Sequence, residues 1–115
     1  MLSPDTQRLL LNFRAERDWE QFHNLRTLSV SIVLESAELL ELSQWTPDTE
    51  LPSVVVQKME QIKHEVADIA ILMSYLTNDL GIDLDAAVRS KLLINGKKYP
   101  VEKAKGSSKK YDELR

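Results

Sequence analysis

The stretch LSVSIVLESAELLELSQW at residues 28–45 determines the expected fold, together with HEVADIAILMSYL at residues 64–76. Both stretches are apolar, yet Glu35 and Glu38 lie three residues apart in the first, as Glu65 and Asp68 do in the second. Side chains at i and i+3 share one face of a helix. A like-charge pair in apolar surroundings needs a shared proton or a cation. Carboxylate oxygens are ligands that Mg²⁺ prefers, so the spacing predicts an acidic metal site between two long helices.

The rest of the chain adds two further helices. Ser3 and Pro4 are typical of a helix start, and Asp83 is placed to cap a later helix. We expect helices from Pro4 to near Phe22, over 24–45, over 53–80 with Gly81 as the stop, and from Asp83 to Asn95-Gly96. No stretch has the alternating pattern of a strand, so the sequence predicts an all-α fold, a four-helix bundle. Apolar residues nearly encircle the helix over 24–45, which predicts a homodimer or homotetramer.

Composition indicates a single domain over residues 1–115, with about 97–115 as a basic C-terminal segment. Residues 1–96 carry 8 Lys+Arg against 15 Asp+Glu, and residues 97–115 carry 7 against 3. An acidic body argues against binding a nucleic-acid polymer. The sequence has no cysteine, no pattern of a signal peptide and no apolar run of membrane-spanning length. We therefore expect a cytoplasmic protein that does not bind membranes.

Four blocks in the same order as in a known family strengthen this interpretation: RDWEQFHN at 17–24, ESAELLELSQW at 35–45, HEVADIAILMSYL at 64–76 and KLLINGKKYPVEKAKGSSKKYDEL at 91–114. Together they resemble the MazG-like nucleotide pyrophosphohydrolases, and most of all their dCTP pyrophosphatase branch. The resemblance implies an all-helical, Mg²⁺-dependent enzyme that cuts a nucleoside triphosphate into monophosphate and pyrophosphate. It further implies a role in sanitising the nucleotide pool, with dCTP or a related pyrimidine nucleotide as substrate.

The resemblance also implies roles for particular residues. The metal ligands would be Glu35, Glu38, Glu65 and Asp68, with Glu35 and Glu38 as the catalytic carboxylates and Glu38 as the base. The substrate-binding residues would be Trp19, His23 and Trp45 at the base and Lys91, Asn95, Lys98 and Tyr99 at the triphosphate.

Other interpretations of the same residues remain open at this stage. Glutamates on amphipathic helices are most often solvated, tryptophans are most often core residues, and lysines at a helix end are favoured by the helix dipole alone. Glu41 lies off the carboxylate stripe and is better placed facing solvent or next to the ligands. A di-iron bundle would need Glu-x-x-His on two helices, which this chain lacks. A non-catalytic oligomeric module that binds nucleotide or regulates a partner is the alternative to an enzyme.

Overall fold

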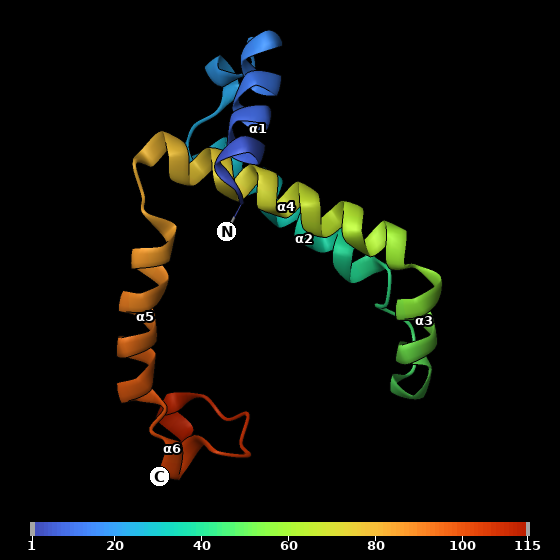
Figure 1. Cartoon of the computed structure of the whole chain (residues 1–115). Helices are drawn as coiled ribbons and strands as arrows, with labels where there is room; N and C mark the ends of the chain where they lie inside the picture. The colour runs from blue at the N-terminus through green and yellow to red at the C-terminus, as the bar shows by residue number, and fades with distance from the viewer. Residues whose placement is uncertain (1, 115) are drawn as a thin grey trace. The chain divides into compact units, whose positions relative to one another are not determined.

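The computed structural model describes residues 2–114 and contains only helices, turns and loops over that range, which confirms the predicted all-α class. The α-helices are α1 (Pro4–Glu16), α2 (Leu25–Glu41), α3 (Leu51–Gln57), α4 (Met59–Leu80), α5 (Leu84–Lys98) and α6 (Val101–Ala104), shown in Figure 1. Short 3₁₀ helices cover Glu20–Phe22, Asp48–Glu50 and Tyr111–Glu113. The chain divides into two compact units, one ending at Gly81 and the other beginning at Ile82.

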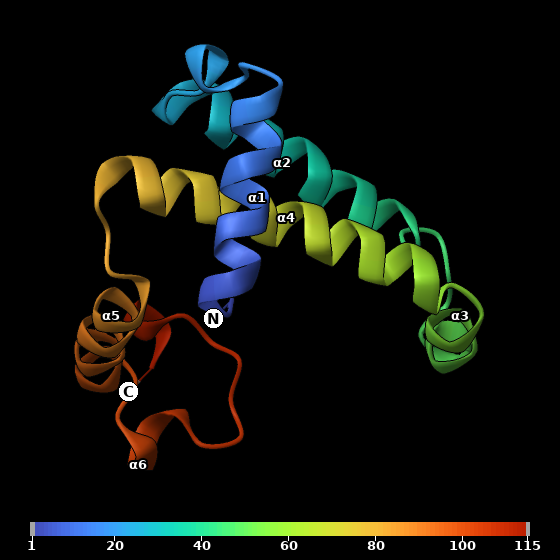
Figure 2. The ribbon, with the colours of Figure 1, turned by 45° about the horizontal axis from the view of Figure 1, so that its top comes forward.

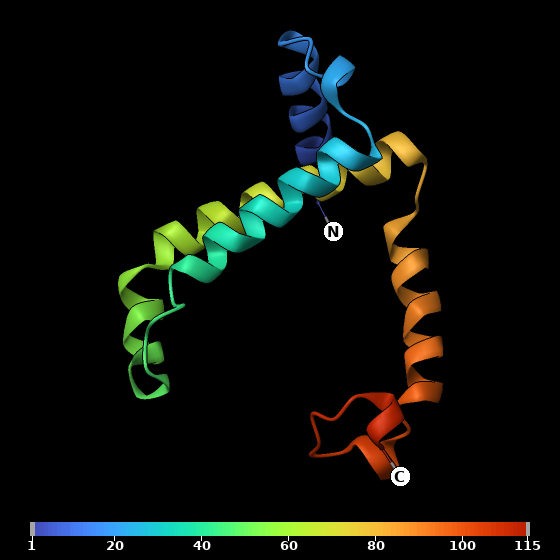
Figure 3. The ribbon, with the colours of Figure 1, turned by 180° about the vertical axis from the view of Figure 1, so that it is seen from behind.

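Helices α2 and α4 form the centre of the first unit, where they lie side by side and antiparallel (Figures 1 and 3). Helix α1 packs against α4 near the N-terminal end of α2, and Figure 2 shows it crossing the pair. The small core at this crossing holds Leu10, Leu28 and Tyr75. The Tyr75 hydroxyl donates a 2.7 Å hydrogen bond to the carbonyl oxygen of Leu10, so this buried phenol is satisfied by the α1 backbone.

Helix starts follow the expected capping chemistry. The Ser3 hydroxyl accepts a hydrogen bond from the Thr6 amide at 3.2 Å, and Asp83 accepts from the Ala86 amide at 3.1 Å. At the start of α2, Asn24 and Thr27 form a reciprocal capping box, with both hydrogen bonds at 2.9 Å. These caps set the N-terminal boundaries of α1, α2 and α5.

Several predicted helix ends were wrong by a few residues. Helix α1 ends at Glu16 instead of near Phe22, because Asp18 adopts a left-handed conformation with φ of 52° and breaks the helical path. Helix α2 ends at Glu41 instead of at Trp45, because the following turn is tightened by i→i+3 bonds such as Ser43 N–H to Leu40 C=O at 3.0 Å. The predicted stop at Gly81 is confirmed by its φ of 65°.

The single helix predicted over 53–80 is divided in the structure, because Lys58 leaves helical geometry with φ of −107° and ψ of 19°. A run of β-branched valines precedes it, and such residues are weaker helix formers. The Lys58 ammonium donates to the carbonyl oxygen of Leu42 at 3.1 Å, where α2 has ended. Lys58 thus lies at the break between α3 and α4, and its side chain satisfies a carbonyl just after the C-terminal end of α2.

In the second unit α5 continues to Lys98, beyond the predicted end at Asn95-Gly96. Tyr99 leaves the helical region because Pro100 follows it, and its amide closes the last turn on the carbonyl of Asn95 at 2.8 Å. Within residues 2–114, no helix is both long enough and apolar enough to cross a membrane.

Candidate metal and nucleotide site

A cluster of three carboxylates lies where α2 faces α4. Oxygens of Glu35, Glu38 and Glu65 are all within 4.8 Å of one another. Glu35 and Glu38 are one turn apart on α2, and the antiparallel pairing of the helices brings Glu65 of α4 opposite them. The predicted approach of the two helical motifs is therefore present for three of the four carboxylates.

The electrostatics of this cluster are those of groups that repel one another. Close approach to the Glu65 carboxyl raises the pKa of Glu35, and burial and the charge of Asp68 raise it further. The Glu35 carboxyl in turn raises the pKa of Glu38, which is exposed. One oxygen each of Glu35 and Glu65 is buried and has no hydrogen-bond partner within residues 2–114. Two orphaned buried carboxylate oxygens in contact with a third carboxylate form a donor set that a hard divalent cation fits.

Asp68 and Glu41 lie outside this group. Asp68 is one turn beyond Glu65 on α4 and is exposed, and its charge still acts on Glu35. Glu41 is exposed at the end of α2 and acts on Glu38 only through its charge. The structure thus brings together Glu35, Glu38 and Glu65, with Asp68 at the rim of the cluster.

The three residues predicted at the base are distributed over both ends of α2. Trp19 and His23 precede the helix, whereas Trp45 follows it. The 17 residues of α2 span about 25 Å at 1.5 Å per residue, so one copy of the chain does not bring Trp45 to Trp19. Trp45 is 88% exposed, which excludes core packing within the described part of the chain. Trp19 is 45% exposed and meets the Phe13 ring edge-on at 5.8 Å.

His23 lies in a polar network that the sequence did not indicate. The Arg14 guanidinium is 3% exposed and binds both oxygens of Asp79 at 2.8 Å, and it lies 3.1 Å from Nδ1 of His23. The His23 ring also contacts the ring of Tyr75, with centroids 5.3 Å apart. Arg14 and Asp79 are 65 residues apart, and helical spacing carries no signal for such a pair. A buried arginine on an otherwise amphipathic helix becomes recognisable only when its partner is known.

In the second unit, the predicted triphosphate-binding residues Lys91, Asn95 and Lys98 share one face of α5, because the helix persists through all three. The Lys98 ammonium lies 4.8 Å from the centre of the Tyr111 ring, and Tyr99 meets the same ring edge-on at 6.3 Å. Tyr111 thus holds the end of α5 against the C-terminal segment, a contact that sequence reasoning missed.

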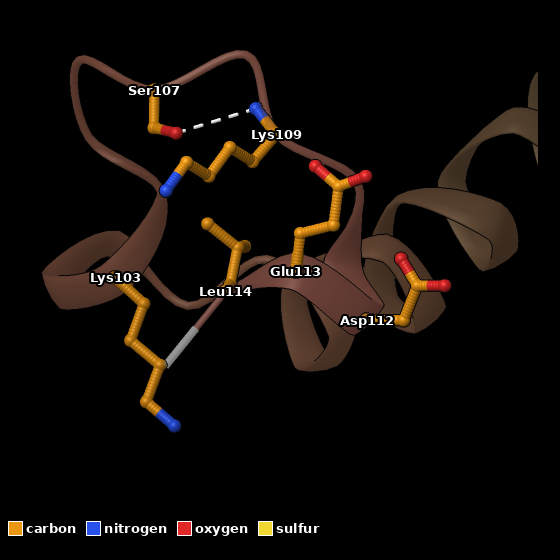
Figure 4. Close-up of a pocket in the computed structure, with 6 residues that line it drawn as sticks. All are labelled: Lys103, Ser107, Lys109, Asp112, Glu113 and Leu114. Carbon is orange, nitrogen blue, oxygen red and sulfur yellow. Dashed lines mark hydrogen bonds between the residues drawn. The ribbon is translucent and has the colours of Figure 1, made fainter.

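A hollow of about 640 Å³ lies in the C-terminal segment (Figure 4). It is lined by Lys103, Ser107, Lys109, Asp112, Glu113 and Leu114. The Lys109 amide donates to the Ser107 hydroxyl at 3.2 Å and shapes the loop that closes the hollow. Its lining mixes two lysines with two acids, so it lacks the uniformly positive character of a phosphate site.

Comparison with known proteins identifies relatives of this chain both by sequence and by structure. Residues 30–114 match the family model of the MazG-like family. The chain is 42% identical over 112 residues to dCTP pyrophosphatase 1 of Homo sapiens and 41% identical to dCTP pyrophosphatase 1 of Bos taurus. These alignments cover 96% of this chain and 66% of each relative, so the chain spans slightly less than two thirds of their length. A crystal structure of a pyrophosphatase from Archaeoglobus fulgidus matches with a TM-score of 0.80 and 35% identity, covering 84% of this chain and 90% of that one.

Proposed function

Because the chain belongs to the MazG-like family, we propose that it is a Mg²⁺-dependent nucleoside triphosphate pyrophosphohydrolase that releases monophosphate and pyrophosphate. The observation that carries the proposal is the group of Glu35, Glu38 and Glu65, with two buried oxygens that have no partner among the described residues. A stable fold gains nothing from repelling carboxylates, whereas a cation site requires them.

The proposed ligands of Mg²⁺ are Glu35, Glu38, Glu65 and Asp68, and the donor set fits because it consists of hard oxygens from two facing helices. Bound Mg²⁺ would neutralise the negative field of the carboxylates and of the triphosphate, orient the phosphates and make water a better nucleophile. The remaining tasks fall to the side chains of the protein.

In the proposed reaction, a water oxygen forms a bond to the α-phosphorus while the bond from that phosphorus to the α,β-bridging oxygen breaks. The leaving group is pyrophosphate, and the proton of the attacking water passes to Glu38. The exposed position of Glu38 leaves it accessible to water, which suits a group that accepts the proton of the attacking water. Glu35, whose free oxygen is buried, would be the more rigid of the two catalytic carboxylates.

The proposed phosphate-binding residues are Lys91, Asn95, Lys98 and Tyr99, supported by the shared helical face of the first three. The proposed base-binding residues are Trp19, His23 and Trp45. Since Trp19 and Trp45 lie at opposite ends of α2, a pocket that uses both rings must take them from two copies of the chain. The exposed apolar side chains of α2, which include Val30, Val33 and Leu34, agree with the homodimer or homotetramer that we propose.

We propose dCTP or a related pyrimidine deoxynucleotide as the substrate, and the cytoplasmic nucleotide pool as its source. The support is the 42% identity to dCTP pyrophosphatase 1. Stacking on the aromatic rings would hold any base. The preference among bases would come from the polar edge of the base, because only some bases present the edge that matches the pocket.

The decisive experiment measures pyrophosphate release from a panel of canonical and modified nucleoside triphosphates, with Mg²⁺ and with EDTA. We expect Mg²⁺-dependent release that is fastest with a pyrimidine deoxynucleotide. Glu38→Gln should abolish turnover without unfolding the chain, whereas Glu60→Gln, an exposed acid at the start of α4, serves as the matched control. Tight nucleotide binding without pyrophosphate release from any triphosphate would favour a non-catalytic binding module instead.

A further inference from the structure

The Arg14 guanidinium is buried where α1 crosses α4. Its two terminal nitrogens bind the two oxygens of Asp79 at 2.8 Å each, in the parallel arrangement that gives the strongest arginine–carboxylate pairs. The guanidinium carbon lies 4.5 Å from the centre of the Tyr75 ring, which covers one face of the group. Arg14 is therefore held from two directions, and its charge is balanced locally by Asp79.

A further contact of this guanidinium determines the protonation state of His23. One terminal nitrogen of Arg14 lies 3.1 Å from Nδ1 of His23. A guanidinium has five N–H donors and no acceptor, so the hydrogen bond must run from Arg14 to Nδ1. An imidazole nitrogen that accepts carries no proton, and in a neutral ring the proton then sits on Nε2. The geometry thus selects one tautomer of His23 and disfavours the doubly protonated cation.

The charged and titratable groups around His23 shift its pKa in opposite directions. Burial and the charge of Arg14 on α1 lower the pKa of His23, while Asp79 on α4 and Glu20 on the neighbouring 3₁₀ helix raise it. Tyr75 on α4 contributes its ring, and burial raises the pKa of its phenol, so it stays neutral. The lowering influences dominate at His23.

We propose that Arg14 and Asp79 are positioning residues that hold His23 as a neutral imidazole protonated on Nε2, and that this Nε2–H donates a hydrogen bond to the base of the bound nucleotide. The second half rests on the proposed function. A neutral donor suits a neutral acceptor, such as a carbonyl oxygen or an unprotonated ring nitrogen of a base, whereas phosphate would favour a cation. His23 is only half-buried, and no hydrogen bond from Nε2 to the described residues competes for the donor.

The positioning half is tested by following the titration of His23 by NMR, with His64→Gln used to assign the resonances of the two histidines. In the unaltered chain we expect a midpoint below 6.5. Asp79→Asn removes a group that raises the pKa, so the midpoint should fall further. Arg14→Met removes the lowering charge and leaves Asp79 facing the ring, so the midpoint should rise. A midpoint at or above 6.5 in the unaltered chain, or shifts of both variants in the same direction, would overturn the positioning role.

If Arg14→Met does not fold, the unaltered chain and the isosteric Asp79→Asn variant still decide the positioning half. Glu20→Gln is the control for long-range charge effects, because Glu20 is 71% exposed and lies 3.9 Å from Arg14. It should change the His23 midpoint less than Asp79→Asn does.

The base-donor half is tested by kinetics. His23→Ala should raise KM for dCTP about 3- to 10-fold with a smaller change in kcat, the effect of one lost neutral hydrogen bond. His23→Gln should recover part of this loss, since its amide can accept from Arg14 and donate outward. Inhibition by inorganic tripolyphosphate, which has no base, should be equal in all three proteins.

Unchanged KM for dCTP in His23→Ala with normal turnover would overturn the donor role and leave the proposed function intact. Absence of pyrophosphate release from every triphosphate would remove the donor role with the proposed function, while the NMR titration would still decide the positioning half.

Discussion

Replacement of Asp79 by alanine should destabilise this protein more than loss of any exposed acid. The Arg14 guanidinium would keep its position, 3% exposed, but without the two 2.8 Å hydrogen bonds that balance its charge. Removing one partner of a fully buried pair costs about 3–5 kcal/mol of unfolding free energy. The Asp79 side chain is 24% exposed, so water can partly replace it, and we expect a loss of about 2–4 kcal/mol. For a chain of this size that corresponds to roughly 8–16 °C in Tm.

The measurement is urea unfolding followed by far-UV circular dichroism at fixed protein concentration, since association would otherwise change the apparent stability. Glu60→Ala is the matched control on the same helix, because Glu60 pairs with Lys63 at 3.2 Å but is 77% exposed. Its loss should be about 1 kcal/mol or less. Arg14→Met combined with Asp79→Leu should be less destabilised than Asp79→Ala, because no uncompensated charge remains.

The same pair gives a pH dependence with a definite sign. The hydrogen bonds from Arg14 hold the pKa of Asp79 below its usual value of 3.8. A carboxyl with a lowered pKa stabilises the fold fully above that usual value, and the contribution is lost as the pH falls from there through the lowered pKa. Asp79→Ala should therefore unfold with a shallower acid dependence than the unaltered chain. Equal losses for Asp79→Ala and Glu60→Ala at neutral pH, or identical acid profiles, would refute the reasoning.

Three further predictions concern the site and the assembly. Compared with the unaltered chain, Glu35→Gln should have a higher Tm in EDTA and a lower Tm in Mg²⁺. The reason is that the pKa of Glu35 is raised, so its negative charge disfavours the metal-free fold at neutral pH. A lower Tm of the variant in EDTA would contradict repulsion between the carboxylates. Tm should rise with protein concentration in differential scanning calorimetry, as expected for a homo-oligomer, and a monodisperse active monomer in light scattering would contradict it. Trp45→Ala should weaken nucleotide binding by about 1–3 kcal/mol, with an effect on KM that depends on the base. Lys98→Ala should lower kcat/KM equally for all bases. The reverse pattern in steady-state kinetics would mean that the two residues have each other's role.

The sequence was sufficient for the features that depend on neighbours along the chain. Capping at Ser3 and Asp83, the stop at Gly81 and the one-turn spacing of Glu35 and Glu38 all follow from local geometry. The all-α class followed from the same local signals. The ends of α1 and α2 were less predictable, since small differences in free energy decide whether the last turn remains helical.

The spacing of the carboxylates predicted a site between two helices, but periodicity on one helix does not say which face of another helix it meets. The close approach of Glu65 to Glu35 and Glu38, with Asp68 outside the group, therefore depends on how α2 and α4 pack. At the break in the helix predicted over 53–80, the Lys58 ammonium likewise meets a partner outside that segment, the carbonyl of Leu42. These features belong to the packing of α2 against α4.

What the sequence by itself determined is therefore the set of helices and the chemical character of their faces, since both are fixed by interactions over one or two turns. Only the tertiary structure decided that Arg14 pairs with Asp79 beside His23. The physical reason is that contacts between distant residues depend on how the helices cross. That arrangement results from the burial of Leu10, Leu28 and Tyr75 together, to which each residue contributes apolar surface without specifying its neighbours.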